Sequence, residues 1–200
     1  MGWICEHLIA HPPGPVVMLK TLRKICQVGV ISEAAPQPDE LLRVRAALDE
    51  RIRSVLGRAL CIRHVDAGSC NGCELEIQAL NNAYYNLEGL GIRFVASPRH
   101  ADLLLVTGPV SANMEAPLRR VYEAMPDPKL VVALGDCGCT GGIFGERGAR
   151  GSDRACRGRV SNVIPVDVTV PGCPPSPRRI MAGILTALAT PAARAPENEP

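Results

Sequence analysis

Two cysteines three residues apart, Cys70 and Cys73, stand in the segment HVDAGSCNGCELEI, between a short apolar run and the first turn of a predicted helix. Thiolates at this spacing are typical of a zinc knuckle, a dithiol redox pair or half of an iron–sulfur site. Further cysteines follow in GDCGCTGG, which contains Cys137 and Cys139, and in VPGCPPSP, which contains Cys173. The chain has nine cysteines, and an odd number weakens a disulfide interpretation. We therefore expect metal ligands or catalytic thiols.

The elements that must position these cysteines are indicated by the pattern of apolar residues, which changes near Cys61. Strands are predicted at 61–65, 92–96, 102–108, 129–135 and 163–170, and helices at 74–87, 114–124 and 176–189. Strands that alternate with helices predict an α/β protein with a doubly wound parallel sheet. Upstream, the spacing of apolar residues predicts an amphipathic helix, and EAAPQPDE at 33–40 is typical of a linker. We expect an N-terminal segment and linker at 1–36, the helix at 37–60, an α/β domain at 61–190 and a tail at 191–200.

Each cysteine motif comes just after the carboxyl end of a predicted strand. In an open parallel sheet these ends lie along one edge, so three distant segments would deliver thiols to one place. Structural zinc sites usually pair two CxxC motifs within a short span, whereas here one pair is completed by single cysteines far away, which favours a cluster. A dithiol oxidoreductase would leave Cys137 and Cys173 without a role. By spacing alone either Cys137 or Cys139, in an expected extended loop, could be the third ligand.

Composition excludes several classes of function. The net charge is +2, which gives no electrostatic reason to expect nucleic-acid binding. No run of about 18 apolar residues predicts a membrane span. The N-terminus has Glu6 and prolines where an export signal has basic and then unbroken apolar residues. We expect a cytoplasmic protein.

Four blocks of this sequence resemble a known family. DAGSCNGCELEI, ASPRHADLLLVTGPVS, ALGDCGCTGGIFGE and NVIPVDVTVPGCPPSP are similar, in this order, to the small-subunit family shared by nickel-iron hydrogenases and the B-type iron–sulfur subunit of respiratory NADH:quinone oxidoreductase. The resemblance covers about residues 61–188. It implies a flavodoxin-like fold and one 4Fe-4S cluster that exchanges electrons with a partner's active site or a quinone pocket. The implied ligands are Cys70, Cys73, Cys137 and Cys173.

Two departures from the family's patterns suggest a branch. In the respiratory B-type subunit the first two ligands are adjacent cysteines, whereas Asn71 and Gly72 separate them here, as in hydrogenases. Uptake hydrogenase small subunits carry an exported leader and a C-terminal domain with more clusters, whereas no cysteine follows Cys173. The chain thus resembles the small subunit of membrane-bound, energy-converting hydrogenases, including the formate hydrogenlyase type. The respiratory B-type subunit and a zinc-stabilised interaction module are the alternatives.

The resemblance also implies partners and a location. We expect an electron-relay subunit of an oxidoreductase complex, inactive alone, that binds a nickel-iron large subunit, a ferredoxin-like subunit and membrane-arm subunits. It would lie on the cytoplasmic face of the membrane. Relatives tend to begin near the equivalent of MLKTLRK, so Met18 is expected to be the true start.

Other residues near the motifs receive smaller roles. The family pattern selects Cys137 over Cys139, which we expect to be a small buried thiol. Glu76 follows Cys73 by three residues, where a carboxylate could couple protons to electron transfer or simply accept a hydrogen bond. Glu74 is expected to complement the helix dipole, and His64 and Asp66 to be hydrogen-bonded near the sheet edge.

Overall fold

The computed structural model describes residues 38–144 and 155–189, together with Leu19, Arg23 and Cys26. The chain divides into two compact units, Met1–Ala35 and Pro36–Pro200, and the fold below is that of the second unit. The expected start at Met18, the tail at 191–200 and most of the segment 1–36 fall outside the described residues. The four-part division of the chain stays a prediction.

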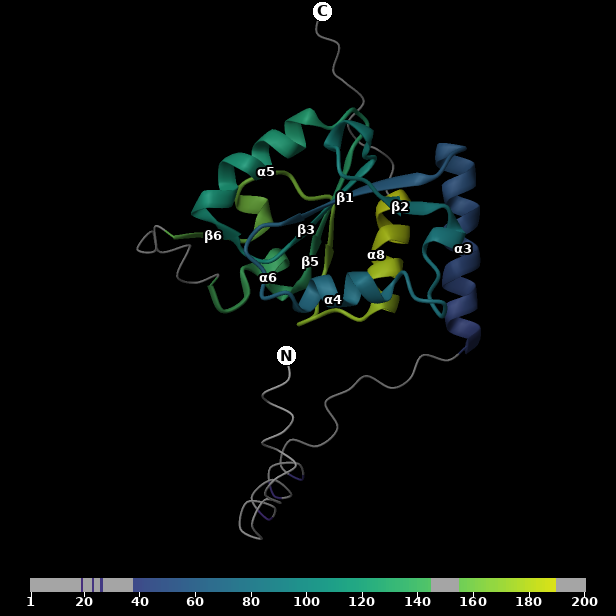
Figure 1. The fold of residues 1–200 in the computed structure, drawn as a ribbon, viewed down its shortest axis with the longest axis horizontal. Helices are drawn as coiled ribbons and strands as arrows, with labels where there is room; N and C mark the ends of the chain where they lie inside the picture. Colours follow the sequence, from purple (N-terminus) through teal and green to yellow (C-terminus); the bar gives the residue numbers. More distant parts are fainter. Residues whose placement is uncertain (1–18, 20–22, 24–25, 27–37, 145–154, 190–200) are drawn as a thin grey trace, which may run out of the picture. The chain divides into compact units, whose positions relative to one another are not determined.

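A five-stranded sheet, parallel throughout, forms the centre of this unit (Figure 1). In chain order its strands are β1 (Leu60–Asp66), β2 (Ile92–Phe94), β3 (Leu103–Thr107), β5 (Leu130–Leu134) and β7 (Val168–Val170). Their order in space is β2-β1-β3-β5-β7, so the chain moves outward from β1 in one direction and then returns to build the sheet in the other. This is the doubly wound, flavodoxin-like order with its switch point between β1 and β3. The predicted fold class, including a helix ahead of the sheet, is confirmed.

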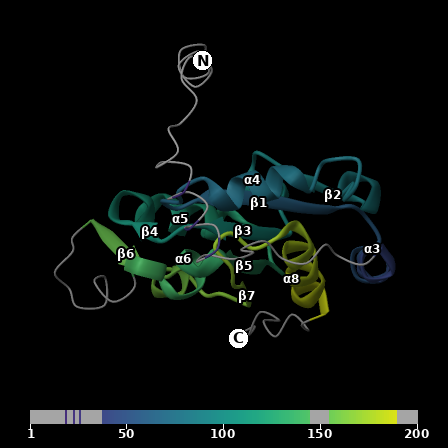
Figure 2. The same ribbon diagram turned by 90° about the horizontal axis from the view of Figure 1, so that it is seen from below.

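Helices cover both faces of the sheet. The helices α3 (Pro38–Leu56), α4 (Gly72–Ala79) and α8 (Pro177–Ala189) pack on one face and α5 (Ala112–Ala124) on the other (Figures 1 and 2). Side chains alternate along β3, so that Leu103 and Leu105 face α8 while Leu104 and Val106 face α5, and all four are fully buried. A strand buried on both faces has an unbroken apolar sequence, which explains the run LLLV.

Several predicted elements are shorter than expected. The first helix, α3, ends at Leu56 and does not continue to 60, because Gly57 adopts a φ of +60°, and left-handed glycines end helices. The helix that carries Cys73, α4, ends at Ala79, and the Asn82 side chain then accepts hydrogen bonds from the Tyr84 and Tyr85 backbone N–H groups to form a turn. The predicted strand at 163–170 contributes only Val168–Val170 to the sheet.

The segment that carries Cys137 and Cys139 is helical, so the expected extended loop was wrong. It forms the short helix α6 (Gly135–Thr140). Two tertiary hydrogen bonds hold its start: the Asp136 N–H donates to the Gly172 carbonyl (2.9 Å), and the Gly172 N–H donates to Asp136 Oδ1 (2.8 Å). These bonds to the loop after β7 override the weak helix propensity of a glycine-rich segment.

A second, two-stranded antiparallel sheet pairs β4 (Val110–Ser111) with β6 (Cys156–Gly158). Neither strand was expected from the sequence pattern, because each is too short to show a period of two. Among the described residues, no helix has both the length and the apolar character needed to cross a membrane.

Substitution of Gly183, in the middle of α8, tests how closely this helix packs on β7. A Cβ at this position would lie 2.2 Å from Val170 Cγ2 in β7. Although alanine favours helix by about 1 kcal/mol over glycine, we expect Gly183→Ala to lower the free energy of unfolding by about 1–3 kcal/mol through overpacking. Urea denaturation would measure the loss, and adding Val170→Ala should restore much of it. A Gly183→Ala protein more stable than the wild type would contradict this packing.

Candidate functional site

Four cysteines from three loops line one pocket at the carboxyl edge of the sheet. Cys70 and Cys73 follow β1, Cys137 follows β5, and Cys173 follows β7. The pocket has about 350 Å³ of space, part of it open to solvent, and Gly108 after β3 and Pro174 after Cys173 also line it. Figure 1 shows α4 and α6, which carry Cys73 and Cys137, at the same end of the strands. The structure therefore brings together the four cysteines that the sequence singled out, beside the switch point where ligands bind in such folds.

The remaining described cysteines lie outside this pocket. Cys139 is half-buried, and its Sγ lies 3.5 Å from the Ala133 carbonyl, within hydrogen-bonding distance. Burial raises the pKa of this thiol to about 11. Residues two apart in a helix are separated by about 200°, so Cys137 and Cys139 point in different directions. Cys61 and Cys156 are also half-buried, and the Gly158 N–H donates to Cys156 Sγ (3.3 Å).

Glycine backbone lies directly against two of the pocket thiols. A Cβ on Gly135, whose φ is +81°, would lie 2.7 Å from Cys73 Sγ. A Cβ on Gly142, whose φ is +52°, would lie 2.9 Å from Cys137 Sγ. Both positions combine a left-handed backbone with a close approach, and only glycine meets both conditions without strain. Any other residue would push a thiol out of place.

Two of the pocket thiols, those of Cys73 and Cys137, disfavour carrying negative charge. Burial is the largest cause that raises the pKa of Cys73 to about 12, and the charges of Glu74, Cys70, Cys137 and Cys173 add to it. Burial also raises the pKa of Cys137, with Cys173 and Cys70 as the next causes. Thiolates become the stable form when a metal supplies positive charge, so binding a metal would release protons from this site.

The donor set fits an iron–sulfur cluster. Four thiols surround a space, and within 38–144 and 155–189 no three His, Cys, Asp or Glu side chains are arranged to hold a single ion. A cubane cluster takes one cysteine at each of four separate corners, and its sulfides accept hydrogen bonds from nearby backbone N–H groups. Because Gly135 and Gly142 have no side chain, they leave the space beside the Cys73 and Cys137 thiols that such a group needs.

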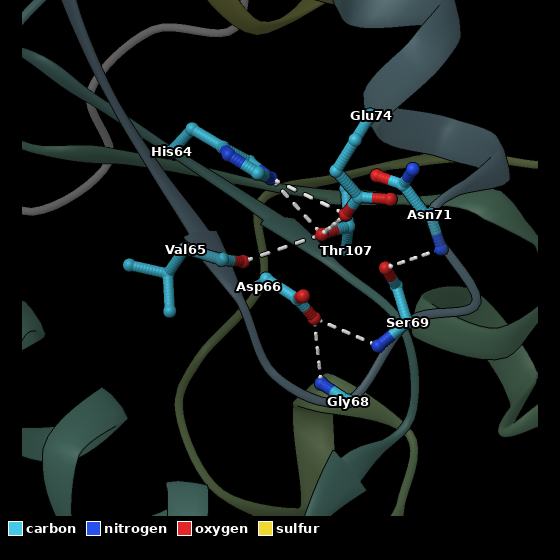
Figure 3. A network of polar contacts seen from close by, with 8 residues as sticks. All are labelled: His64, Val65, Asp66, Gly68, Ser69, Asn71, Glu74 and Thr107. Carbon is cyan, nitrogen blue, oxygen red and sulfur yellow. Dashed lines mark hydrogen bonds and ion pairs between the residues drawn. The ribbon is translucent and has the colours of Figure 1, made fainter. Parts of the chain in front are cut away.

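Side chains hold the loop that carries Cys70 (Figure 3). Asp66 Oδ1 accepts hydrogen bonds from the backbone N–H groups of Gly68 (2.8 Å) and Ser69 (2.7 Å). Ser69 Oγ in turn accepts from the Asn71 N–H (3.1 Å). The expectation that Asp66 is hydrogen-bonded at the sheet edge is confirmed. These bonds shape the turn that connects β1 to α4.

A second polar contact ties α4 to the sheet, and the sequence did not point to it. Glu74 lies in the first turn of α4, but its carboxylate turns toward β3 and accepts a hydrogen bond from the Thr107 hydroxyl (Figure 3). His64 Nε2 lies 3.0 Å from Thr107 Oγ1 and 3.6 Å from Glu74 Oε1, so His64 is hydrogen-bonded as expected. Burial lowers the pKa of His64, and the Glu74 carboxylate opposes this shift in part. The one signal in the sequence was a threonine at the end of the apolar run LLLVTG.

Glu76, the candidate for proton coupling, lies on the same helix and is half-buried. It is not among the residues that line the pocket. Its role in coupling protons to electron transfer stays a prediction.

Comparison with known proteins places this pocket in a family. Residues 70–187 match the family described as NADH ubiquinone oxidoreductase, 20 Kd subunit. A probable membrane-bound hydrogenase subunit, MbhJ, of Pyrococcus furiosus is 44% identical over 147 residues, which is 72% of this chain and 84% of that protein. Formate hydrogenlyase subunit 7 of Escherichia coli is 40% identical over 151 residues, which is 75% of this chain and 55% of that protein.

A solved structure agrees with the fold. One chain of the membrane-bound sulfane sulfur reductase, an archaeal respiratory membrane complex, superimposes with a TM-score of 0.55 at 34% sequence identity, over 75% of each chain. The region that matches the family spans more than half of this chain and contains all four cysteines of the pocket. The chain therefore belongs to the family of the 20 kDa subunit of NADH ubiquinone oxidoreductase.

Proposed function

We propose that this chain is the electron-transfer subunit of a membrane-associated hydrogenase complex of the formate hydrogenlyase type. It holds one 4Fe-4S cluster through Cys70, Cys73, Cys137 and Cys173. The observation that carries the proposal is the meeting of these four thiols, from three loops, in one pocket. Similarity to hydrogenase subunits of Pyrococcus furiosus and Escherichia coli supports the assignment to hydrogenases.

Residues of the chain would hold this group and control its surroundings. Cys73 and Cys137 are half-buried, whereas Cys70 and Cys173 are exposed, so the site opens on one side toward solvent or a partner. The bound cluster would supply transfer of one electron at a time. Backbone N–H groups at the start of α4 point toward no side-chain cap and are therefore free to donate to sulfide.

Exposed apolar side chains close to the cysteine loops support docking of a partner. Leu75 is two residues after Cys73 and is 56% exposed. Ile143 is 82% exposed and Phe144 is 39% exposed, and both directly follow Gly142, which lies against Cys137. Apolar surface next to a redox site is suited to close contact with another subunit. The partners would be a nickel-iron hydrogenase-like large subunit, a ferredoxin-like subunit and membrane-arm subunits.

In this assignment the chain is peripheral to the inner face of the cell membrane and has no activity alone. The alternative is a B-type subunit of a quinone-reducing complex, which the family's description favours. The two residues between Cys70 and Cys73 favour the hydrogenase branch. A zinc-stabilised module is a third reading, and purified protein without the brown colour of iron sulfide would support it.

Cysteine substitutions test the ligand set. We expect Ser at position 70, 73, 137 or 173 to lower bound iron well below the wild-type value of about four per chain and to remove the low-temperature paramagnetic signal, because a cubane needs a ligand at each corner. Iron analysis and electron paramagnetic resonance on the four variants would measure both effects.

Cys139→Ser is the matched control, because Cys139 is half-buried two residues from Cys137 yet does not line the pocket. It should keep its iron. Loss of the cluster in Cys139→Ser with retention in Cys137→Ser would show that the ligand in α6 is misassigned.

Two left-handed glycines allow a test that separates the effect of close contact with a thiol from the effect of backbone strain. Gly135 and Gly91 have similar φ values, +81° and +75°, but a Cβ on Gly91 meets no atom within 4 Å, whereas one on Gly135 would strike Cys73 Sγ. We expect both alanine variants to lose about 1–2 kcal/mol of stability to the left-handed backbone, and Gly135→Ala alone to lose iron. Denaturation and iron analysis would test this, and equal iron content in the two variants would argue against a site that needs close glycine backbone.

The apolar rim of the pocket predicts how the partner binds. A tagged chain purified from its native host in mild detergent should bring a nickel-containing large subunit with it. Ile143→Glu should reduce that nickel several-fold without loss of iron from the chain, because a charge would enter an apolar contact. Val55→Glu is the control, since Val55 is 48% exposed near the end of α3 that leads into the start of β1, at the opposite end of the strand from the cysteines. Equal nickel recovery with both variants would contradict a docking surface at Ile143.

A further inference from the structure

The helix that carries Cys73 begins without a side-chain cap. Asn71, at the cap position, has a φ of +73°, and its side chain makes no capping hydrogen bond. The Leu75 N–H donates to the Asn71 carbonyl (3.2 Å), so the N–H groups of Gly72, Cys73 and Glu74 precede the first bond of the helical ladder. The positive end of the helix dipole therefore lies uncapped at the edge of the cysteine pocket.

Glu74 occupies the third position of α4, from which a glutamate commonly folds back to the backbone N–H of the cap residue. That arrangement is absent here, because the Asn71 N–H already donates to Ser69 Oγ (3.1 Å). The Glu74 carboxylate instead accepts the hydrogen bond of Thr107, and its second oxygen, Oε2, is buried with no hydrogen-bond partner. The Thr107 hydroxyl thus gives this carboxylate its hydrogen bond, and His64 Nε2 lies beside it at 3.6 Å from Oε1.

Thr107 is suited to this task by its surroundings. It is fully buried at the last position of β3, the central strand of the sheet, and a β-branched side chain there has few rotamers. Its hydroxyl proton is directed to Glu74 Oε1, the nearer acceptor, rather than to the Val65 carbonyl at 3.5 Å, so its oxygen can accept a hydrogen bond from His64 Nε2 at 3.0 Å. Three strand and helix ends, those of β1, β3 and α4, meet at this one hydroxyl (Figure 3).

We propose that Thr107 is a positioning residue for the iron–sulfur site. Its hydroxyl holds the Glu74 carboxylate against the sheet, which keeps this charge off the N-terminal amides of α4 and fixes the turn that carries Cys73. The inference rests on the proposed function, since it assigns a role to Thr107 relative to that cluster. Without the hydroxyl, the buried carboxylate loses its hydrogen-bond donor and keeps only His64 Nε2, which lies 3.6 Å from Glu74 Oε1. The uncapped N–H groups of α4 are then the nearest donors of its own helix. Negative charge closer to the cluster would make its reduction harder.

The first experiment uses the full-length chain loaded with iron and sulfide. Thr107→Val removes the hydroxyl at nearly constant shape, and Thr107→Ser keeps it. We expect Thr107→Val to shift the midpoint potential to more negative values in a redox titration followed by paramagnetic resonance, and Thr107→Ser to keep the wild-type potential. Loss of iron in Thr107→Val with full retention in Thr107→Ser would equally support the proposal, because it shows that the hydroxyl holds the Cys73 turn.

The same titration has results that overturn the proposal. Wild-type potential and iron content in Thr107→Val would show that the hydroxyl has no influence. A Thr107→Ser protein as impaired as Thr107→Val would show that packing alone matters. The shift must also depend on the carboxylate, so in a Glu74→Gln background Thr107→Val should move the potential little, and an undiminished shift there would refute the role of Glu74.

A second measurement, on the chain before cluster loading, separates failure of this inference from failure of the proposed function. If Thr107 binds Glu74, the shifts in urea midpoint caused by Thr107→Val and Glu74→Gln should be strongly non-additive in the double variant. Additive shifts would overturn the contact itself. A wild-type chain that binds no iron would overturn the proposed function and with it the role of Thr107 at the cluster, whereas a wild-type cluster with unchanged Thr107→Val would overturn only the inference.

Discussion

Burial of cysteine side chains in one small pocket is the constraint on which the rest of this structure depends. Burial raises the pKa of Cys73 to about 12, and the charges of Glu74 and of the other three pocket cysteines add to it, so a charged thiol here is unfavourable unless positive charge joins it. The parallel sheet overcomes the geometric part of this problem. Its strands end at one edge, and their rigid, doubly buried packing holds the loops after β1, β5 and β7 close together.

The loops themselves are fixed by carboxylates that accept hydrogen bonds from backbone N–H groups. Asp136 joins the start of α6 to Gly172 in the loop after β7, so the segments of Cys137 and Cys173 are tied to each other. Asp66 shapes the turn before Cys70 in a similar way. Hydrogen bonds to carboxylates are stronger than those between neutral groups, which suits loops that have few apolar contacts of their own. At Gly135 and Gly142 the backbone lies so close to a thiol that any side chain there would displace it.

Three exposed apolar side chains lie near this organised edge, whereas the core is divided between the two faces of the sheet. Ile143, Phe144 and Leu75 belong to the segments that follow the cysteines, so the arrangement that positions the thiols also presents an apolar rim. The buried cluster of α3, α4 and α8 lies on one face and that of α5 on the other. The buried core and the exposed apolar surface thus occupy different parts of one unit, as expected for a subunit of a larger complex.

The sequence by itself determined the fold class and the cysteines that meet. Unbroken apolar runs such as LLLV that alternate with helical patterns are typical of strands buried on both faces, and a parallel sheet brings the residues after its strands to one edge. The choice between Cys137 and Cys139 was beyond spacing alone and came from resemblance to a family. In the structure both lie in α6, whose helical turn directs Cys139 toward Ala133 and Cys137 toward the pocket. The start of this helix is bonded to Gly172, 36 residues from Asp136 in the chain.

Only the tertiary structure decided the partners of the polar groups. The sequence indicates that Glu74 lies in a first helical turn, but not that its carboxylate turns to Thr107, because the contact joins residues 33 apart in the chain and depends on where β3 ends. Gly135 and Gly142 stand in the motif GDCGCTGG, but the sequence does not indicate which thiol each of them lies against. Local patterns report periodicity and burial over a few residues, whereas a hydrogen bond or a close approach between distant loops follows from the packing of the whole sheet.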